Sequence, residues 1–339
     1  MILQTIWYVL VIVLLIGYAI LDGFDLGVGV LHLRVARTDT ERRLSLNAIG
    51  PFWDGNEVWL LTGGGALFAA FPPVYATVFS GFYLAMILVL FALIMRAISM
   101  EFRSKVESPR WRFFWDKLFS LGSFLAALLF GVAVGNLMRG IPLDASGEFT
   151  GSFFGLLNPF SLLMGVLSLA MFTMQGAVFL LVKAEDEMRS RAKAWAWKAF
   201  YAFVVLHVVG VVWSFAEARW LFDRFEGMHL PWLFVCLFWA SVVALWFFLK
   251  KDRALPAFAA SSAAIATQIA ALAAGAFPVL APSRTSTDFS LTAFNASSSE
   301  LTLKTMLILA LIGVPLVLGY TIWIYWIYRG KSRLEPEGY

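Results

Sequence analysis

Long apolar stretches without charged residues recur along the whole chain, separated by short segments that carry most of the Lys, Arg, Asp and Glu residues. The uncharged stretches cover residues 1–21, 58–95, 118–138, 149–182, 254–283 and 305–328. A bilayer-spanning helix needs about 20 consecutive apolar residues, so each stretch can supply one span, or two with a turn between them. The pattern predicts an all-α, polytopic membrane helical bundle.

Nine membrane-spanning helices are predicted from this pattern. They cover residues 5–33, 48–71, 75–97, 115–138, 157–183, 197–217, 230–250, 255–281 and 303–328. The second and third are separated by Pro72 and Pro73, which break a helix and favour a turn. Because only short linkers join the spans, residues 1–339 are expected to form a single integral membrane domain.

Composition agrees with the membrane interpretation and argues against other classes of protein. The chain is 60% hydrophobic and 14% charged, with a mean hydropathy of +0.79, whereas a soluble domain carries about 25% charged residues. Its net charge of +4 is spread over many loops, which argues against nucleic-acid binding. The one cysteine, Cys236, excludes an internal disulfide, an iron–sulfur cluster and a Cys-x-x-Cys-His haem attachment. It is expected to be a small core residue.

Basic residues between the predicted spans set the expected orientation. All but five of the 26 Lys and Arg residues lie on one side of the predicted topology; the exceptions are Arg139, Arg219, Arg224, Arg284 and Lys304. Loops rich in Lys and Arg stay in the cytoplasm. We therefore expect the N-terminus outside and the C-terminus in the cytoplasm, which nine spans allow.

Four carboxylates stand out within the first two predicted spans. The segment "GYAILDGFDLGVGVLHL" holds Asp22 and Asp25, and "GPFWDGNEVWLLTGGGALFAAFPP" holds Asp54 and Glu57. Each pair is spaced i, i+3 and so lies on one helix face. Since the two spans are antiparallel, all four acids are expected at one depth, toward the cytoplasm. Intramembrane acids are costly, face the protein interior or water, and often relay protons.

A plainer interpretation exists for the same acids. Asp54 and Glu57 follow Gly50-Pro51 in the first turns of a helix, where the helix dipole stabilises an anion. They could also pair with an arginine at the membrane surface, and Arg96 is a candidate partner for a carboxylate such as Asp54. The residues alone leave both interpretations open.

Histidines and uncharged polar residues offer little further chemistry. Of the three histidines, only His207 lies deep in a predicted span, so no second deep histidine can complete a haem pair. A single histidine among Val and Phe is typical of a packing residue, and Asn136, Asn158 and Gln175 are expected to join helices. No metal site and no cofactor ligand are therefore expected in this chain.

Several long segments resemble subunit II of the cytochrome bd-type quinol oxidases. They include the two carboxylate segments, "RWRFFWDKLFSLGSF", "GNLMRGIPL", "LLNPFSLLMGVLSLAMFTMQGA" and "FNASSSELTLKTM". The resemblance extends over essentially the whole chain and is strongest in the first 180 residues.

The resemblance implies a heterodimer with subunit I in the bacterial plasma (inner) membrane, which oxidises quinol and reduces oxygen to water. Subunit I would carry two haem b and one haem d, or a b-type variant, with none of the ligands in this chain. A structural quinone, bound lipid and a small single-span accessory subunit are compatible with the family. Asp25 and Asp54, with Asp22 nearby, match the carboxylates through which the family takes protons from the cytoplasm. Glu57 stands where the family often has Gln.

Two other functions fit the acids before the resemblance is considered. A proton-coupled secondary transporter would need a substrate site on broken midplane helices, whereas these acids lie toward the cytoplasm. A purely structural partner subunit would use them only in assembly.

Overall fold

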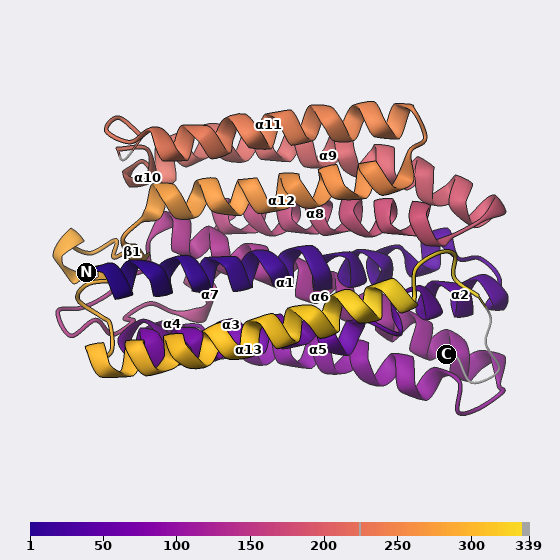
Figure 1. Cartoon of the computed structure of the whole chain (residues 1–339), viewed down its shortest axis with the longest axis horizontal. Coiled ribbons are helices and arrows are strands. Elements are labelled where there is room, and N and C mark those ends of the chain that lie inside the picture. The colour runs from indigo at the N-terminus through magenta and orange to yellow at the C-terminus, as the bar shows by residue number, and fades with distance from the viewer. Residues whose placement is uncertain (224, 334–339) are drawn as a thin grey trace.

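The protein is a bundle of long helices that lie side by side, as Figure 1 shows for a computed structural model that describes residues 1–223 and 225–333. The expected outer residue Arg224 lies outside the described residues. The helices are α1 (Ile2–Val35), α2 (Asp39–Ile49), α3 (Trp53–Ala70), α4 (Pro72–Gly81), α5 (Tyr83–Arg103), α6 (Pro109–Arg139), α7 (Phe153–Leu156), α8 (Pro159–Lys183), α9 (Asp186–Glu217), α10 (Trp220–Asp223), α11 (His229–Lys250), α12 (Ala254–Ala276) and α13 (Glu300–Ile327).

Helix α8 forms the centre of the bundle and packs against α1, α6, α9 and α12. Its crossing with α1 is close because glycines face each other there. A Cβ atom on Gly27 would lie 1.9 Å from the Phe172 carbonyl oxygen, and one on Gly176 would lie 2.3 Å from the Gly27 backbone. Small residues let membrane helices approach in this way, and the crossing fixes the depth of α1 and its carboxylates.

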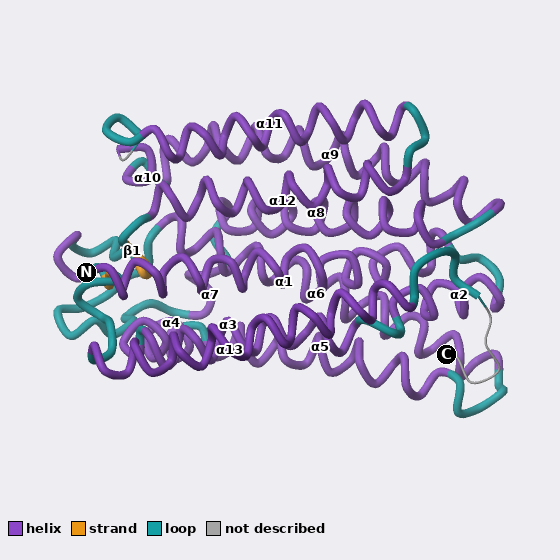
Figure 2. Tube along the Cα trace, in the orientation of Figure 1, coloured by secondary structure: helices purple, strands orange, loops and turns teal. Residues whose placement is uncertain are grey.

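The two ends of the bundle differ in structure. Helices α1 and α13 begin at the same end and run in the same direction (Figure 1). At that end, β1 (Val279–Ala281) and β2 (Leu291–Thr292) form a small antiparallel sheet with Val279 opposite Thr292, and the 3₁₀ helix η1 (Thr287–Phe289) lies between them. Loops and the short helix α2 cover the opposite end (Figure 2).

Eight helices within residues 1–223 and 225–333 are long and apolar enough to span a membrane: α1, α5, α6, α8, α9, α11, α12 and α13. Each overlaps a predicted span, although α9 begins at Asp186 rather than at residue 197 and α6 begins at Pro109 rather than at residue 115. The remaining predicted span, residues 48–71, corresponds to the 18-residue α3, which is less apolar because it carries Asp54, Asn56, Glu57 and Gly63–Gly65. The all-α, multi-pass prediction is therefore confirmed in its main features.

Two further predicted boundaries are wrong. The span expected over 75–97 is two helices, α4 and α5, interrupted at Phe82, and the Phe149 side chain packs against Gly81 beside this break. The span expected over 255–281 ends at Ala276, since Pro278 has no N–H to donate and disfavours helix at Phe277.

The burial of Cys236 also differs from its prediction. It is exposed on α11 rather than packed in the core, because α11 contributes few residues to the interior.

Candidate functional site

Two neighbouring clusters of charged side chains occupy the half of the bundle nearer α2. The first, here called the carboxylate cluster, contains Asp22 and Asp25 of α1, Glu57 of α3 and Arg96 of α5. Asp22, Asp25 and Arg96 have no exposed surface within this chain, and the Glu57 side chain is 24% exposed. The structure thus brings three of the four predicted acids together around one guanidinium group.

Arg96 is the bridge between the two acid pairs. Its Nη2 atom donates to Asp22 Oδ1 at 2.6 Å and to Glu57 Oε1 at 2.9 Å, so α5 joins α1 to α3. The arginine is not paired with Asp54, the partner suggested by the sequence. One guanidinium faces three carboxyl groups, and the cluster therefore has more acidic groups than its cation can neutralise.

Asp25 is held by a different set of donors. Asn56 Nδ2 donates to Asp25 Oδ2 at 2.7 Å and to the Leu21 carbonyl oxygen at 3.3 Å. The Tyr325 hydroxyl of α13 in turn donates to Asn56 Oδ1 at 3.0 Å. The amide orientation follows from this network. A chain of hydrogen bonds therefore runs from the last helix to the buried Asp25 carboxyl.

Several buried polar atoms of the carboxylate cluster have no protein partner among the described residues: Asp22 Oδ2, Asp25 Oδ1, Arg96 Nε and Arg96 Nη1. Buried polar atoms in proteins are nearly always hydrogen-bonded, and ordered water commonly supplies the bond. These unpaired acceptors and donors lie in one place, so they could bind a hydrogen-bonded chain of water molecules between the carboxyl groups. Such an arrangement can hold and pass on a proton.

Asp54 lies apart from this buried group. It is in the first turn of α3 and is exposed, and its side chain makes no hydrogen bond or ion pair with another described residue. Glu57, one turn further along the same helix, is near enough to interact with it electrostatically. Exposure thus falls from Asp54 through Glu57 to Asp22 and Asp25, over about one turn of α3 and the adjacent face of α1.

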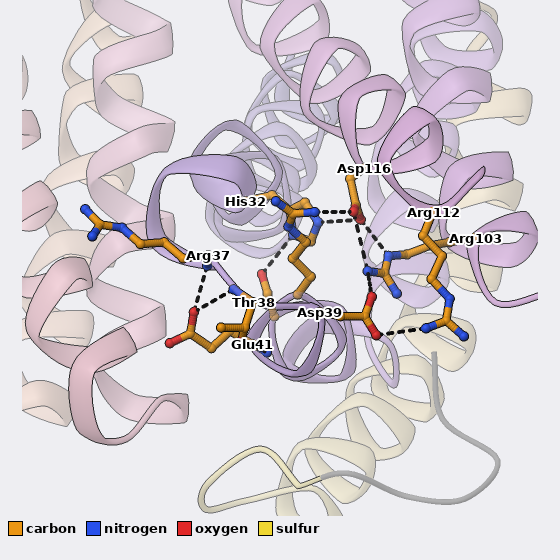
Figure 3. Close-up of polar contacts among 10 residues, drawn as sticks. His32, Arg37, Thr38, Asp39, Glu41, Arg103, Arg112 and Asp116 are labelled. Atoms are coloured by element: carbon orange, nitrogen blue, oxygen red, sulfur yellow. Dashed lines mark hydrogen bonds and ion pairs between the residues drawn. The ribbon is translucent and has the colours of Figure 1, made fainter. Parts of the chain in front are cut away.

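The second group, here called the Asp116 cluster, lies closer to α2 and is drawn in Figure 3. Asp116 of α6 accepts from Arg103 Nε at 2.5 Å and from Arg42 Nη1 at 3.2 Å, and its Oδ1 atom lies 2.9 Å from His32 Nε2. The other nitrogen of His32, Nδ1, lies 3.3 Å from Ser45 Oγ. The carboxyl of Asp116 has no exposed surface, so it ties α1, α2, α5 and α6 together from the inside.

Helix α2 is fixed at its start by a capping box. Thr38 Oγ1 accepts from the Glu41 N–H at 3.2 Å, while Glu41 Oε2 accepts from the N–H groups of Thr38 and Arg37 (Figure 3). Partial burial alone would raise the pKa of Glu41, but the backbone donors of Arg37 and Thr38 and the Arg191 guanidinium bring that pKa below its usual value. The cap therefore holds Glu41 as an anion that also binds α9.

Sequence reasoning missed the Asp116 cluster. Asp116 and His32 are 84 residues apart, each near the end of a different predicted span, so no local spacing in the sequence relates them. The available signal was an acid at the cytoplasmic start of the predicted span 115–138, a position that needs a cation or water.

The remaining polar residues join helices, as predicted. Asn158 Nδ2 donates to Asn136 Oδ1 at 3.0 Å between α8 and α6, and Gln175 binds Ser261 and Ser262 of α12. His207 packs against Phe238 with ring centroids 4.3 Å apart. Within the described part of the chain, no group of three or more His, Cys, Asp or Glu side chains is placed to hold a metal ion.

Comparisons with known proteins agree over nearly the full length. The model of the family described as cytochrome bd terminal oxidase subunit II matches residues 3–328. Cytochrome bd-I ubiquinol oxidase subunit 2 of Escherichia coli K12 is 41% identical, over 98% of this chain and 96% of its own length. Cytochrome bd ubiquinol oxidase subunit 2 of Bacillus subtilis is 35% identical, over 99% of both chains. A solved chain of the bd oxidase from Geobacillus thermodenitrificans shares the fold, with a TM-score of 0.80 at 16% identity, over 97% of this chain and 99% of its own.

Proposed function

The chain belongs to the cytochrome bd terminal oxidase subunit II family, and we propose that it supports assembly with subunit I and provides part of the route by which protons reach the oxygen-reducing centre. It is a subunit of a quinol oxidase. The reaction proposed for the complex is oxidation of quinol and reduction of oxygen to water. Protons for that reduction would come from the cytoplasm.

The proposed topology has nine crossings, with α3 as the second. Helices α1 and α13 run in the same direction, which an odd number of crossings requires (Figure 1). The basic residues of α2 and of the segments before α6 and after α13 lie at the end opposite the N-terminus, and the excess of Lys and Arg in these segments favours the cytoplasm for that end. The whole chain would then be one membrane domain with an outer N-terminus.

One observation carries the proton-route proposal: exposure falls stepwise from Asp54 to Asp25. Asp54 is exposed at the cytoplasmic start of α3, Glu57 is partly exposed, and Asp22 and Asp25 are fully buried with one free carboxyl oxygen each. A proton taken up at Asp54 would pass Glu57 and reach Asp22 or Asp25 through water bound to those free atoms. Arg96 would keep the carboxyl groups close together without excluding the proton.

The haem groups are proposed to belong to subunit I, because the histidines of this chain do not fit a haem iron. Both ring nitrogens of His32 are engaged, by Asp116 and Ser45. His207 is enclosed by the rings of Phe203, Phe238 and Trp239. The third histidine, His229, is exposed at the start of α11. Membership of the family leads us to propose two haem b and one haem d, or a b-type variant, on the other subunit.

Assembly with subunit I is supported by an apolar surface that this chain leaves uncovered. The most apolar part of α13 is entirely unburied, and large apolar side chains are exposed on α3 and α5 beside it. Subunit I and lipid are the proposed partners of this surface. Quinol, a structural quinone and a small accessory subunit remain proposals that rest on the family.

Replacing Asp25 or Asp54 by Asn tests the proton route. A positioned proton carrier is worth roughly 100-fold or more in rate. We therefore expect Asp25→Asn to slow oxygen consumption by the purified complex to about that extent. Asp54→Asn should slow it less, because water can reach its exposed position. Haem content, measured from the reduced-minus-oxidised spectrum, should be unchanged in both variants.

The matched control is Glu107→Gln, which removes an exposed acid from the loop between α5 and α6. It should leave turnover at the wild-type value. Wild-type turnover in Asp25→Asn at equal haem content would refute the proton route. The purely structural alternative, favoured by the hydrogen bond from Asn56 to Asp25, predicts that turnover and haem content fall together in Asp25→Asn.

A further inference from the structure

A basic pocket lies beside the start of α3, outside both clusters described above. It has a volume of about 520 Å³ and is bounded by the end of α2, by Gly50, Pro51 and Phe52, by the end of α8 and by the residues that follow α13. Four cationic side chains line it: Lys183, Arg329, Lys331 and Arg333. This pocket is at the end of the bundle that we propose faces the cytoplasm.

None of these four cations forms an ion pair with a described residue. Lys183 is 8% exposed; its Nζ atom donates to the Tyr328 carbonyl oxygen at 2.5 Å and lies 5.2 Å from the centroid of the Phe52 ring. Lys331 Nζ donates to the Ala184 carbonyl oxygen at 2.8 Å. Burial is the main cause that lowers the pKa of Lys331, with Arg189 adding to it. Within the part of the chain that the structure describes, the Glu185 carboxylate acts on Lys331, and the four cations of the pocket outnumber such acids.

The chain segment after α13 is held against the bundle, so the pocket is a built feature. The Ser332 N–H donates to the Lys183 carbonyl oxygen at 2.9 Å, and Ser332 Oγ donates to the Leu44 carbonyl oxygen at 2.9 Å. Asn47 Nδ2 donates to the Arg333 carbonyl oxygen at 3.0 Å. These bonds fix the basic segment next to α2 and α8.

The position of the pocket suits the head group of a lipid. Trp326 and Tyr328 lie at the end of α13, where aromatic residues mark the boundary between membrane and water. Pro51, Phe52 and Ile327 add apolar surface to the same pocket. A phospholipid places a phosphate at that level and its glycerol and acyl chains beside apolar surface, whereas a free phosphate would leave the apolar wall uncovered. Basic pockets of this kind between helices bind anionic head groups.

We propose that this pocket binds the head group of an anionic phospholipid from the cytoplasmic leaflet, with its phosphate between Lys183, Lys331 and Arg333. The proposal goes beyond the proton route and uses the proposed orientation only to name the leaflet. The Phe52 wall of the pocket stacks on Tyr325 with ring centroids 4.4 Å apart, and Tyr325 donates to Asn56. A bound head group would thus steady the donors that hold Asp25.

The test is a titration of the purified, delipidated two-subunit complex in neutral detergent. Isothermal titration calorimetry is run with dihexanoylphosphatidylglycerol, with dihexanoylphosphatidylcholine and with inorganic phosphate. The variants are Lys331→Gln combined with Arg333→Gln, and the charge-conserving Lys331→Arg combined with Arg333→Lys. The matched control is Lys250→Gln combined with Lys251→Gln, which removes two basic residues at the same end of the bundle.

The expected result is saturable binding of phosphatidylglycerol and none of phosphatidylcholine. The Gln pair should weaken phosphatidylglycerol binding by at least roughly tenfold, since each cation near an anionic head group contributes appreciably. The charge-conserving pair and the Lys250 and Lys251 control should bind as the wild type does.

Four results would overturn the proposal. Equal binding of the two lipids would show that charge is not recognised, and equal binding of inorganic phosphate would assign the pocket to a free anion. An equal loss in the control pair would indicate general surface charge. Absence of any phosphatidylglycerol binding to the complex would mean that the partner subunit covers the pocket.

Discussion

Replacing Asp116 by Asn removes the anion at the centre of the Asp116 cluster while keeping the size of the side chain. The substituted residue would still lie among Arg103, Arg42 and His32, the groups that contact Asp116 in the native chain. Arg103 is 1% exposed and keeps one other carboxylate, Asp39, at 2.7 Å. The substitution therefore leaves the buried Arg103 guanidinium with one of its two carboxylate partners.

The magnitude follows from what remains after the substitution. Removing one partner of a buried ion pair costs about 3 to 5 kcal/mol because the other charge is left uncompensated. The lower end applies here, since Arg103 keeps Asp39 and the Arg42 side chain is 20% exposed and can be hydrated. At about 2.1 cal/mol/K of unfolding entropy per residue, a destabilisation of about 3 kcal/mol lowers the melting temperature of a 339-residue chain by roughly 4 °C.

Thermal unfolding of the purified complex, followed by intrinsic tryptophan fluorescence at pH 7, measures the effect. The matched control is Asp39→Asn, because Asp39 contacts the same Arg103 but its side chain is 47% exposed. Exposed pairs contribute about 0 to 1 kcal/mol, so this control should melt within about 2 °C of the wild type. Equal melting temperatures for the two variants would refute the argument that burial makes the Asp116 cluster important for stability.

Two further predictions concern helix packing and pH. Gly176→Ala places a methyl group 2.3 Å from the Gly27 backbone, so α1 and α8 must separate. Overpacking of this kind costs about 1 to 3 kcal/mol and should lower the melting temperature. Gly227→Ala, in the exposed loop before α11, should leave it unchanged. The Arg189 guanidinium is the main cause that lowers the pKa of Asp252 below its usual 3.8, and Lys193 adds to the effect. The ionised carboxylate therefore stabilises the folded state above pH 3.8. This contribution is lost as the pH falls through the lowered pKa. Asp252→Asn should therefore destabilise the complex slightly at pH 7, by up to about 1 kcal/mol, and the difference from wild type should vanish in acid; a difference that grows in acid would contradict the assignment.

Local patterns in the sequence predicted the parts of this structure that depend on neighbouring residues. The long apolar runs predicted the helices, and the turn at Pro72 agrees with the boundary between α3 and α4. The i, i+3 spacing of Asp22 and Asp25 put both on one buried face, as the structure has them. Each of these features is decided by a few consecutive side chains and by the helical period.

Features that depend on distant residues were missed. The packing of Phe149 against Gly81, beside the break at Phe82, involves a separate loop. Arg96 pairs with Asp22 and Glu57 rather than with Asp54, because the choice depends on how α5 packs against α1 and α3. The same holds for the basic pocket, whose walls come from three separate parts of the chain. Helical periodicity has no information about such contacts.

The hydrogen bond between Tyr325 and Asn56 has a consequence for biosynthesis. It joins residues that are 269 positions apart, and Tyr325 belongs to α13, which leaves the ribosome after α1 to α12. Asn56, which orients the Asp25 carboxyl, thus receives its own donor only after α13 has been made. A nascent chain that has inserted α1 through α12 still carries this pair without its final partner. Completion of the buried polar centre is thereby tied to the synthesis of α13, and a chain truncated before α13 has that centre unfinished.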